Sequence, residues 1–421
     1  MLDNRVLSGS KSMGKYVMTL IKWIVFSIIM GAVGALAGVV FHFSVDIATH
    51  FRADNPKVLF LLPLAGVIIV FLYHVSNMDN DKGTNQILDS ARTGGKVSFL
   101  VTPLIIISTT LTHLCGGSSG REGAALQIGG SIGSKFARIL RLEGFNASVC
   151  VMCGMSALFS AVFGTPLTAA IFALEVINVG VIQYSALLPV VLSSVISFSI
   201  AGLFHVERTE FLVKAFPEIS LSSLSGVLFL SVLVAVVSIV FVLSMHKTNK
   251  LFASKIPNKY VRVILGAAMV IVLTLLVGTY DYNGAGMDVI TKAIENGTAR
   301  PEAFILKIIF TAITLSAGFK GGEIVPTFFI GSTFGVLVSP IVGLNPSFAA
   351  AIGLVALFCG VVNCPIASII LSIELFGAEG VLFFAIAVAV SYIVSGYYSL
   401  YSGQKIVYSK LKSDLIDMNA K

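Results

Sequence analysis

The residues best placed to do chemistry are two glutamates that follow glycine-rich breaks in a very apolar chain. Glu122 lies in the sequence GGSSGREGAALQIGGSIG at 116–133, and Glu323 follows the glycine-rich segment 318–322. Glycines let the backbone turn sharply, and the first N–H groups of the following helix have no intrahelical partner, which makes an anion site. Glu122 lies where such an anion would bind and can be neutralised by a proton, so we expect it to alternate with a transported anion for the same amides. A functional role is favoured for Glu122, whereas functional and structural roles are equally open for Glu323.

Four further ionisable residues lie in or beside apolar segments, where charge is costly. They are Arg121, His113, Glu175 and Glu374. Glu175 and Glu374 each end an apolar run, so a structural role at the membrane interface is favoured over a functional one. Arg121 is expected to neutralise a neighbour or to reach the interface. His113 is expected to be an ordinary helix histidine with its hydrogen bonds satisfied.

The composition defines the class of protein in which these residues must work. With 56% hydrophobic and 12% charged residues and a mean hydropathy of +0.94 over 421 residues, the chain is a polytopic membrane protein and not a soluble globule. The apolar run 17–47 is too long for a signal peptide, so it predicts the first spanning helix. The net charge of +7 comes from basic residues in short connections between apolar runs, which indicates positive-inside topology rather than nucleic-acid binding.

The cysteines give no sign of a metal or redox centre. All five lie in apolar surroundings without the His or Cys partners of a zinc site. Cys150 and Cys153 have the spacing of a redox pair, but inside an apolar helix pattern they are interpreted as packed thiols. We therefore expect no metal and no other cofactor.

Two copies of one unit account for most of the chain. In each copy, two apolar runs are followed by a polar stretch and a third apolar run. These segments are 17–47, 58–75, 76–96 and 97–115 in the first copy, and 221–245, 260–278, 279–300 and 303–317 in the second. Individual residues match at a nearly constant offset, since Glu175 matches Glu374 at 199 and Gly129 matches Gly331 at 202. An internal duplication explains this better than chance similarity does.

Basic residues orient the two copies in the membrane. In the first copy they follow the second apolar run, whereas in the second copy they separate the first and second runs. The residues concerned are Lys82, Arg92 and Lys96 in the first copy, and Lys247, Lys250, Lys255, Lys259 and Arg262 in the second. If basic connections face the cytoplasm, the copies have opposite orientations. Inverted repeats with broken helices at matching places, here 116–123 and 318–322, build transporters with a binding site at the membrane midplane.

The chain divides accordingly into five parts. They are a cytoplasmic N-terminal segment 1–16, a first membrane repeat 17–204, an external connection 205–220, a second, inverted repeat 221–378, and last helices with a basic cytoplasmic tail 379–421. Runs such as 326–335 and 365–376 are shorter than the ~20 residues of a spanning helix, so they are expected to be re-entrant or tilted. The predicted fold class is an all-α membrane protein.

Four features in this order resemble the CLC family of chloride channels and anion/proton antiporters. They are GTNQ at 83–86, GREG at 120–123, GGEIVP at 321–326 and Tyr401. GREG alone is a weak signal, but the four together inside an inverted repeat are specific, and the resemblance covers nearly the whole chain. It implies a CLC-like inverted-topology repeat of tilted, re-entrant and broken transmembrane helices. It also implies transport rather than an enzymatic reaction, in a homodimer whose subunits each carry their own pathway.

The resemblance implies roles for individual residues. Glu122 matches the family's external gating glutamate, which fills the anion path when ionised and leaves it when protonated. The N–H groups of Glu323, Ile324 and Val325 match the loop that helps to coordinate the central anion. Tyr401 matches the inner tyrosine whose hydroxyl faces that anion. The remaining members of the predicted anion-binding set are Thr84, Asn85, Gly120, Arg121 and Gly123.

Departures from the family pattern narrow the substrate. Thr84 and Asn85 stand in a segment that usually reads GSG, Ala124 replaces a proline, Glu323 replaces an apolar residue, and Val176 stands where many chloride/proton exchangers have an internal proton-relay glutamate. These departures resemble the bacterial fluoride/proton antiporter branch, which has an asparagine-containing motif, although Val325 is less polar than expected there. We predict a fluoride/proton antiporter that exports fluoride across a bacterial plasma membrane. Asn85, Tyr401 and backbone N–H groups are the expected donors to fluoride.

Other functions are weighed against this one. The alternative within the family is a chloride/proton antiporter or a passive chloride channel. An intramembrane enzyme that uses Glu122 and Glu323 as an acid/base pair belongs to another class, but no nucleophile motif or metal-ligand spacing supports it. A structural or receptor protein would not explain the broken helices. In the antiporter, Glu323 is expected to donate a hydrogen bond when protonated, or to relay protons in place of the missing internal glutamate.

Overall fold

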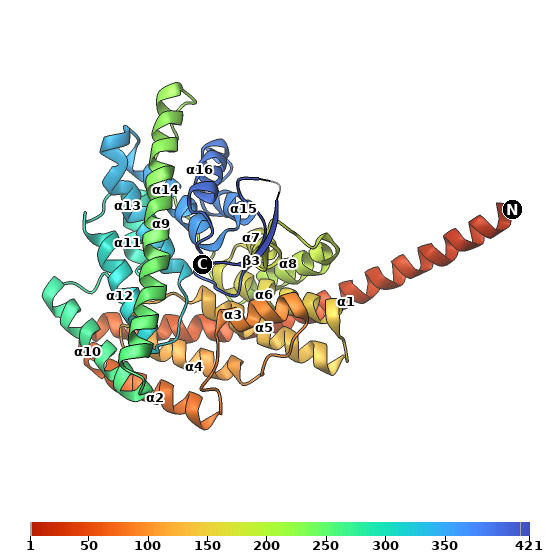
Figure 1. The fold of residues 1–421 in the computed structure, drawn as a ribbon, viewed down its shortest axis with the longest axis horizontal. Coiled ribbons are helices and arrows are strands. Elements are labelled where there is room, and N and C mark those ends of the chain that lie inside the picture. The colour runs from red at the N-terminus through yellow and green to blue at the C-terminus, as the bar shows by residue number, and fades with distance from the viewer. Residues whose placement is uncertain (1, 413) are drawn as a thin grey trace.

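The computed structural model describes residues 2–412 and 414–421, with side chains from residue 13 onward within these ranges. The fold is helical, as the sequence predicts, and its elements form two sets (Figure 1). The first set comprises α1 (Leu2–Asp54), η1 (Pro56–Leu61), α2 (Leu62–Val75), α3 (Thr84–Thr93), α4 (Val101–Leu114), α5 (Glu122–Ile139), α6 (Gly144–Phe163), α7 (Pro166–Glu175), β1 (Asn178–Val179), η2 (Tyr184–Ala186) and α8 (Leu187–Leu203). The second set comprises α9 (Leu221–Lys255), α10 (Lys259–Val277), α11 (Met287–Thr291), η3 (Lys292–Asn296), α12 (Ala303–Ala317), α13 (Ile324–Val342), α14 (Pro346–Val362), α15 (Pro365–Phe376), α16 (Val381–Val394), β2 (Lys405–Tyr408) and β3 (Leu415–Asn419).

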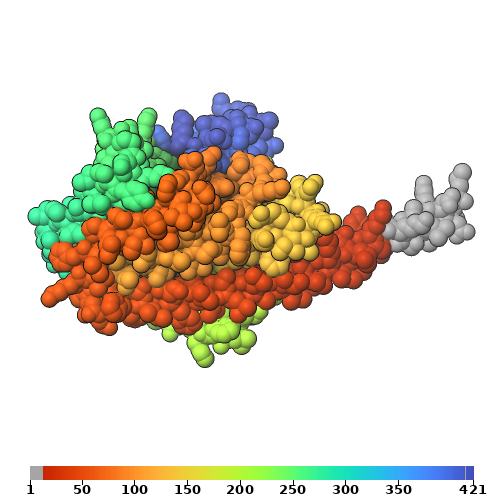
Figure 2. All heavy atoms as spheres, turned by 90° about the horizontal axis from the view of Figure 1, so that it is seen from below, coloured from red at the N-terminus to blue at the C-terminus, as the bar shows by residue number. Residues whose placement is uncertain are grey.

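Seven helices in the described residues are long and apolar enough to cross a membrane. They are α1, α2 with the turn before it, α6, α8 with the turn before it, α9, α10 and α13. The shorter apolar helices are α4, α7, α12, α14, α15 and α16. Figure 2 shows α1, in red, running across one face of the molecule. Its side chains Ile28, Val40 and Ile47 are exposed, as expected for a helix that contacts lipid.

The short apolar runs of the sequence have two different outcomes. The run 365–376 is the short helix α15, as expected. The run 326–335 is part of α13, which continues to Val342, so the helix is longer than the apolar run, and its expected tilt or re-entrance stays a prediction. The helix passes through Gly335, where the run ends, and through Pro340. Gly335 packs closely against α14, where a Cβ would lie 2.1 Å from the carbonyl oxygen of Ala349, and proline is tolerated inside membrane helices.

Glycine contacts show that the two repeats are built in the same way. A Cβ on Gly129 of α5 would lie 2.1 Å from the carbonyl oxygen of Gly154 on α6. The corresponding Cβ on Gly331 of α13 would lie 2.4 Å from the carbonyl oxygen of Gly353 on α14. Each pair of helices therefore packs backbone against backbone, and only glycine permits that distance.

Two carboxylates join the repeats by a reciprocal exchange. Glu175, at the end of α7, accepts hydrogen bonds from the first N–H groups of α15, those of Ile366 (3.1 Å) and Ala367 (2.9 Å). Glu374, in the last turn of α15, accepts hydrogen bonds from the first N–H groups of α7 at 2.9 and 2.8 Å. Each carboxylate thus caps the helix that carries the other. These contacts support the favoured structural role of the two glutamates, and their position at the membrane interface stays a prediction.

The C-terminal part differs from the expected last helices and tail. One helix, α16, is followed by the strands β2 and β3, which form a three-stranded sheet with β1 in the order β1-β2-β3. Strand β1 pairs parallel to β2 with Val179 opposite Ile406, and β3 pairs antiparallel to β2 with Met418 opposite Ile406. Ile406 is buried against Val179 and Ala420, so the sheet has its own small apolar cluster. A basic tail whose apolar residues alternate can therefore pair as strands.

Candidate anion site

The two glycine-rich breaks meet in the interior of the protein. Gly120 and Gly322 exchange two backbone hydrogen bonds, each 2.7 Å long. A Cβ on Gly322 would lie 2.5 Å from the backbone nitrogen of Gly123, so the contact requires glycine. The pairing brings together the first turns of α5 and α13, one from each repeat. Their free N–H groups and positive dipole ends are concentrated at one place, as the sequence predicts.

The Glu122 carboxylate occupies this amide-rich place. Its side chain is 1% exposed, and Oε2 accepts a hydrogen bond of 3.0 Å from the N–H of Arg121. Val325, at the start of α13 in the other repeat, lies beside the carboxylate, because a Cβ on Gly120 would come within 2.7 Å of Oε2 and 3.1 Å of the Cβ of Val325. Gly120 thus leaves room for the carboxylate. The side chain of Glu122 therefore sits among backbone donors as a bound anion would.

Arg121 links this carboxylate to the first helix. Its Nε lies 3.8 Å from Oε1 of Glu122, and its Nη1 donates a 2.9 Å hydrogen bond to Nδ1 of His42 on α1. Of the two expectations for Arg121, neutralisation of a neighbour is the one that the contacts support. His42 was not among the predicted residues, because nothing in the sequence of α1 connects it with the GREG segment.

His113 differs partly from its expected role. Nδ1 lies 2.9 Å from the carbonyl oxygen of Thr109, as in an ordinary helix histidine. Nε2 is buried and has no hydrogen-bond partner among the described residues. The expectation that both ring nitrogens are satisfied was therefore wrong for one of them.

Glu323 is the counterpart of Glu122 in the second repeat. Its Oε2 is buried and has no hydrogen-bond partner in the part of the chain that the structure describes. A Cβ on Gly123, in the first turn of α5, would lie 3.3 Å from this oxygen. Glu122 thus reaches the first turn of α13, while Glu323 lies against the first turn of α5. The two carboxyl groups are placed reciprocally by the inverted repeat.

A cavity of about 520 Å³ reaches Glu323. Its lining includes the predicted residues Thr84, Asn85, Glu323 and Tyr401. Gln127 of α5, which was not predicted, also lines the cavity and donates a 3.2 Å hydrogen bond to Oγ1 of Thr84. The sequence did contain a sign of this role, because Gln127 is a polar residue in an otherwise apolar helix and lies five positions after Glu122.

Polar atoms without partners gather in the lining of this cavity. The Tyr401 hydroxyl and Oε1 of Gln127 are buried and, like Glu323 Oε2, make no hydrogen bond within the described ranges. Oδ1 of Asn85 accepts a 2.8 Å hydrogen bond from the N–H of Gly403, which fixes the amide and leaves Nδ2 as its donor. Buried polar groups normally find partners, so the cavity is suited to a small polar or ionic guest.

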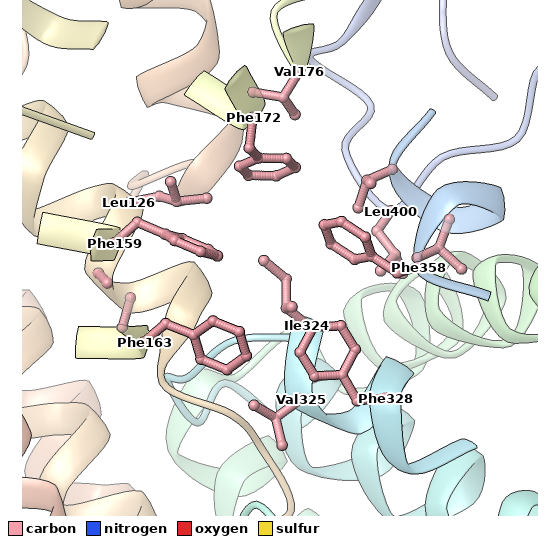
Figure 3. Close-up of a cluster of buried hydrophobic side chains, with 14 of the residues drawn as sticks. Leu126, Phe159, Phe163, Phe172, Val176, Ile324, Val325, Phe328, Phe358 and Leu400 are labelled. Carbon is pink, nitrogen blue, oxygen red and sulfur yellow. The ribbon is translucent and has the colours of Figure 1, made fainter. Parts of the chain in front are cut away.

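Aromatic rings form a buried cluster beside the first turn of α13 (Figure 3). Phe159, Phe163 and Phe172 come from the first repeat, and Phe328 and Phe358 come from the second. The ring centroids of neighbouring pairs are 5.6 or 5.7 Å apart. Figure 3 shows these rings around Ile324, with Val325 beside them. Ile324 and Val325, where backbone donors are predicted, therefore lie beside an apolar cluster, and electrostatic interactions are stronger in such surroundings than in water.

The predicted site residues fall into two neighbouring groups. Gly120, Arg121 and Val325 lie around the Glu122 carboxylate, whereas Thr84, Asn85, Glu323 and Tyr401 line the cavity. Gly123 lies between them, next to the Glu323 carboxylate. Ile324 lies among the aromatic rings of the buried cluster (Figure 3). The structure therefore brings the predicted set together around the paired breaks.

The fold and the site define a polytopic membrane protein made of two inverted repeats, whose broken helices meet at buried carboxyl groups. The model of the voltage gated chloride channel family matches residues 65–396. The chain belongs to this family, the CLC family, and the resemblance found in the sequence is confirmed.

Two relatives with similar sequences support this assignment. The chain is 33% identical over 396 residues to the chloride/fluoride channel protein of Pseudomonas syringae pv. tomato, covering 92% of this chain and 87% of the relative. It is 26% identical over 273 residues to the H(+)/Cl(-) exchange transporter ClcA of Vibrio cholerae, covering 61% of this chain and 58% of the relative.

Solved structures show the same fold. The crystal structure of a CLC-type fluoride/proton antiporter matches with a TM-score of 0.88 and 28% identity, covering 91% of this chain and 98% of that one. A slow cyanobacterial Cl-/H+ antiporter matches with a TM-score of 0.74 and 20% identity over 90% of this chain and 94% of that one, which shows the fold alone.

Proposed function

We propose that this protein is a fluoride/proton antiporter that exports fluoride across a bacterial plasma membrane, with one pathway in each subunit of a homodimer. The observation that carries the proposal is the position of Glu122, whose carboxylate accepts a hydrogen bond from the N–H of Arg121 and lies beside Val325 at the start of α13. A relative described as a chloride/fluoride channel protein and a structure described as a fluoride/proton antiporter support fluoride as the anion.

The mechanism is competition for backbone donors. Ionised Glu122 holds the amides at the first turns of α5 and α13, so an anion cannot bind there. Protonation removes the negative charge, weakens the hydrogen bonds that the side chain accepts, and frees the amides for fluoride. Each exchange of carboxylate for anion is then accompanied by uptake or release of one proton at Glu122. Movement of the two ions is coupled because both depend on the position of one side chain.

Glu323 provides the second proton site. Its unpaired oxygen lies next to Gly123 on one side, and its residue lines the cavity on the other. The position that carries the proton-relay glutamate in many exchangers holds the buried residue Val176 here. Glu323 therefore either relays protons or, when protonated, donates a hydrogen bond to fluoride.

Fluoride is small and strongly hydrated, so its site must supply hydrogen-bond donors in place of water. The hydroxyl of Tyr401 and the amide of Asn85 are available in the cavity, which is consistent with this requirement. Basic residues at the same cavity, Lys82, Lys259 and Arg262, support a cytoplasmic position for it by the positive-inside rule.

The test is ion movement in liposomes that contain the purified protein. Fluoride and chloride efflux are measured with ion-selective electrodes while proton movement is recorded, for the wild type, Glu122→Gln and the control Glu207→Gln, which changes an exposed glutamate. The wild type and the control should export fluoride with opposite proton flow and little chloride movement. Glu122→Gln should lose proton coupling, because the amide cannot titrate.

Each part of the proposal has its own contradicting result. Intact coupling in Glu122→Gln would remove Glu122 from the coupling role. Chloride flux equal to fluoride flux would make the protein a chloride/proton antiporter, and a flux independent of pH would make it a passive channel. Cross-linking in native membranes tests the homodimer, and a monomer alone would contradict it.

A further inference from the structure

An ion pair on the wall of the cavity joins the two repeats. Nζ of Lys320 lies 3.2 Å from Oδ2 of Asp81, although the residues are 239 positions apart in the chain. The Asp81 side chain is 2% exposed and that of Lys320 is 24% exposed. Both residues line the cavity that contains Glu323 and Tyr401. The pair is costly to break because Asp81 without its partner would be an uncompensated buried charge.

Each partner is attached to a segment that carries predicted anion donors. Oδ1 of Asp81 accepts a 3.2 Å hydrogen bond from the N–H of Gly83, which precedes Thr84 and Asn85 at the start of α3. Gly83 has a φ of +59°, so the turn into α3 is sharp and this bond fixes it. One carboxylate thus holds both the donor segment 83–85 and the side chain of Lys320.

Lys320 is held by its place in the second repeat's glycine-rich break and by an aromatic ring of α2. It lies in the break 318–322, three positions before Glu323. Its Nζ also lies 4.2 Å from the centroid of the Tyr73 ring on α2, where a cation is attracted to the aromatic face. The ion pair therefore sets the separation between the segment with Asn85 and the break with Glu323.

We propose that Asp81 and Lys320 are positioning residues that determine the anion selectivity of the transporter. They act without touching the anion, by keeping the donors of the first repeat and the carboxyl group of the second at a separation that suits fluoride. A larger anion such as chloride needs the donors further apart, so a fixed short separation discriminates against it. This inference rests on the proposed function and adds to it the device that sets the selectivity.

A second ion pair at the same cavity provides a matched control. Lys259 and Asp79 also form a charged contact of 3.0 Å, but their side chains are 38% and 36% exposed. The carboxylate of Asp79 pairs with Lys259 and His74 and makes no hydrogen bond to segment 83–85 in the described structure. Asp79→Asn therefore changes charge in the same cavity without releasing the donor segment.

The experiment compares Lys320→Met, Asp81→Asn and the double variant with the wild type, Lys320→Arg and Asp79→Asn. The ratio of fluoride to chloride efflux is measured in liposomes for each. The two single variants change the charge of the cavity in opposite directions, yet both should lower the ratio by about tenfold or more, because both release the same constraint. Lys320→Arg should keep most of the selectivity, and Asp79→Asn should leave it unchanged.

The double variant separates positioning from general damage. It leaves no unpaired buried charge, so it folds even if a single variant does not. Its ratio should be as low as that of the singles and not lower, because one shared constraint can be lost only once. An unchanged ratio in the double variant would overturn the inference.

Changes of opposite sign in the two single variants would also overturn it, because they would show that the cavity's net charge sets the ratio. A wild type that moves chloride as fast as fluoride would contradict the proposed function instead. The pair would then be tested on the preference that the wild type does show, for example chloride over bromide. A wild type that moves no anion would overturn both.

Discussion

Replacing Glu175 or Glu374 by glutamine tests the reciprocal caps at two sites of the same chemistry. Glutamine keeps the shape of the side chain but offers only one acceptor oxygen, so its NH2 group must face the other N–H donor. The donors of Glu175 are the part-buried N–H of Ile366 and the buried N–H of Ala367. Those of Glu374 are more accessible, since the bond from Leu167 is exposed.

This difference in burial sets the expected magnitudes. A hydrogen bond to a charged group contributes about 1.5–3 kcal/mol, and a buried donor left unpaired costs about 1–3 kcal/mol. Glu175→Gln should therefore cost about 3 kcal/mol. Water can replace the exposed bond of Glu374, so Glu374→Gln should cost about 1 kcal/mol. In a chain longer than 250 residues, a loss of about 1 kcal/mol of stability lowers the Tm by at most about 2 °C. The Tm should therefore fall by about 4–6 °C in Glu175→Gln and by about 1–2 °C in Glu374→Gln.

The assay is thermal unfolding of the detergent-solubilised variants, paired with the ratio of proton to fluoride movement in liposomes. The ratio should be unchanged in both variants, because the two glutamates act as caps. Equal Tm shifts, or a larger shift for Glu374→Gln, would refute the argument from burial. A normal Tm with lost proton coupling in Glu175→Gln would show that this carboxyl group carries protons instead.

Three further predictions concern the site and its surroundings. Asn85→Gly removes one donor worth about 1–1.5 kcal/mol, so the ratio of fluoride to chloride efflux should fall by about tenfold, and an unchanged ratio would mean that the amide does not contact the anion. Gly322→Ala should cost about 3 kcal/mol or more, because its Cβ would lie 2.5 Å from a backbone nitrogen of the GREG segment; Gly202→Ala, with nothing within 4 Å, is the control for thermal unfolding. The hydrogen bond from Lys259 is the main reason that the pKa of Asp79 is lowered. The carboxylate therefore stays ionised below the usual pKa of an aspartate. Any contribution of this ion pair to folding stability is lost only as the pH falls through the lowered pKa. Lys259→Met should raise the midpoint of the Asp79 carboxyl titration by NMR, and an unmoved midpoint would contradict this.

Much of the fold follows from the pattern of the sequence. The nearly constant offset between matching residues, such as Glu175 and Glu374, identifies the duplication. The distribution of basic residues identifies the opposite orientation of the two copies. What each glutamate binds could not be predicted, because the reciprocal caps depend on how α7 and α15 lie in space. The small sheet was missed for a related reason, since β1 is two residues long and pairs with β2 more than 200 positions later.

The part of the site that consists of backbone N–H groups could be predicted from the sequence. Glycine-rich breaks point to free N–H groups, and both Glu122 and Glu323 lie at them. The side chains that surround the breaks were harder to predict, since His42, Gln127 and Lys320 reach the site from three different segments. A polar residue in an apolar or loop segment carries no sign of its partner until the fold is known.

The doubly hydrogen-bonded pair of Gly120 and Gly322 has a mechanical consequence. Many transporters with inverted repeats open alternately to the two sides by rocking one repeat against the other. Here such a motion would break both 2.7 Å bonds, and it would also pull apart the caps formed by Glu175 and Glu374. The cost would be at least several kcal/mol, because buried backbone groups would be left unpaired. For the proposed antiporter we therefore expect the two repeats to stay fixed relative to each other, with access to either side of the membrane changed by rotation of the Glu122 and Glu323 side chains.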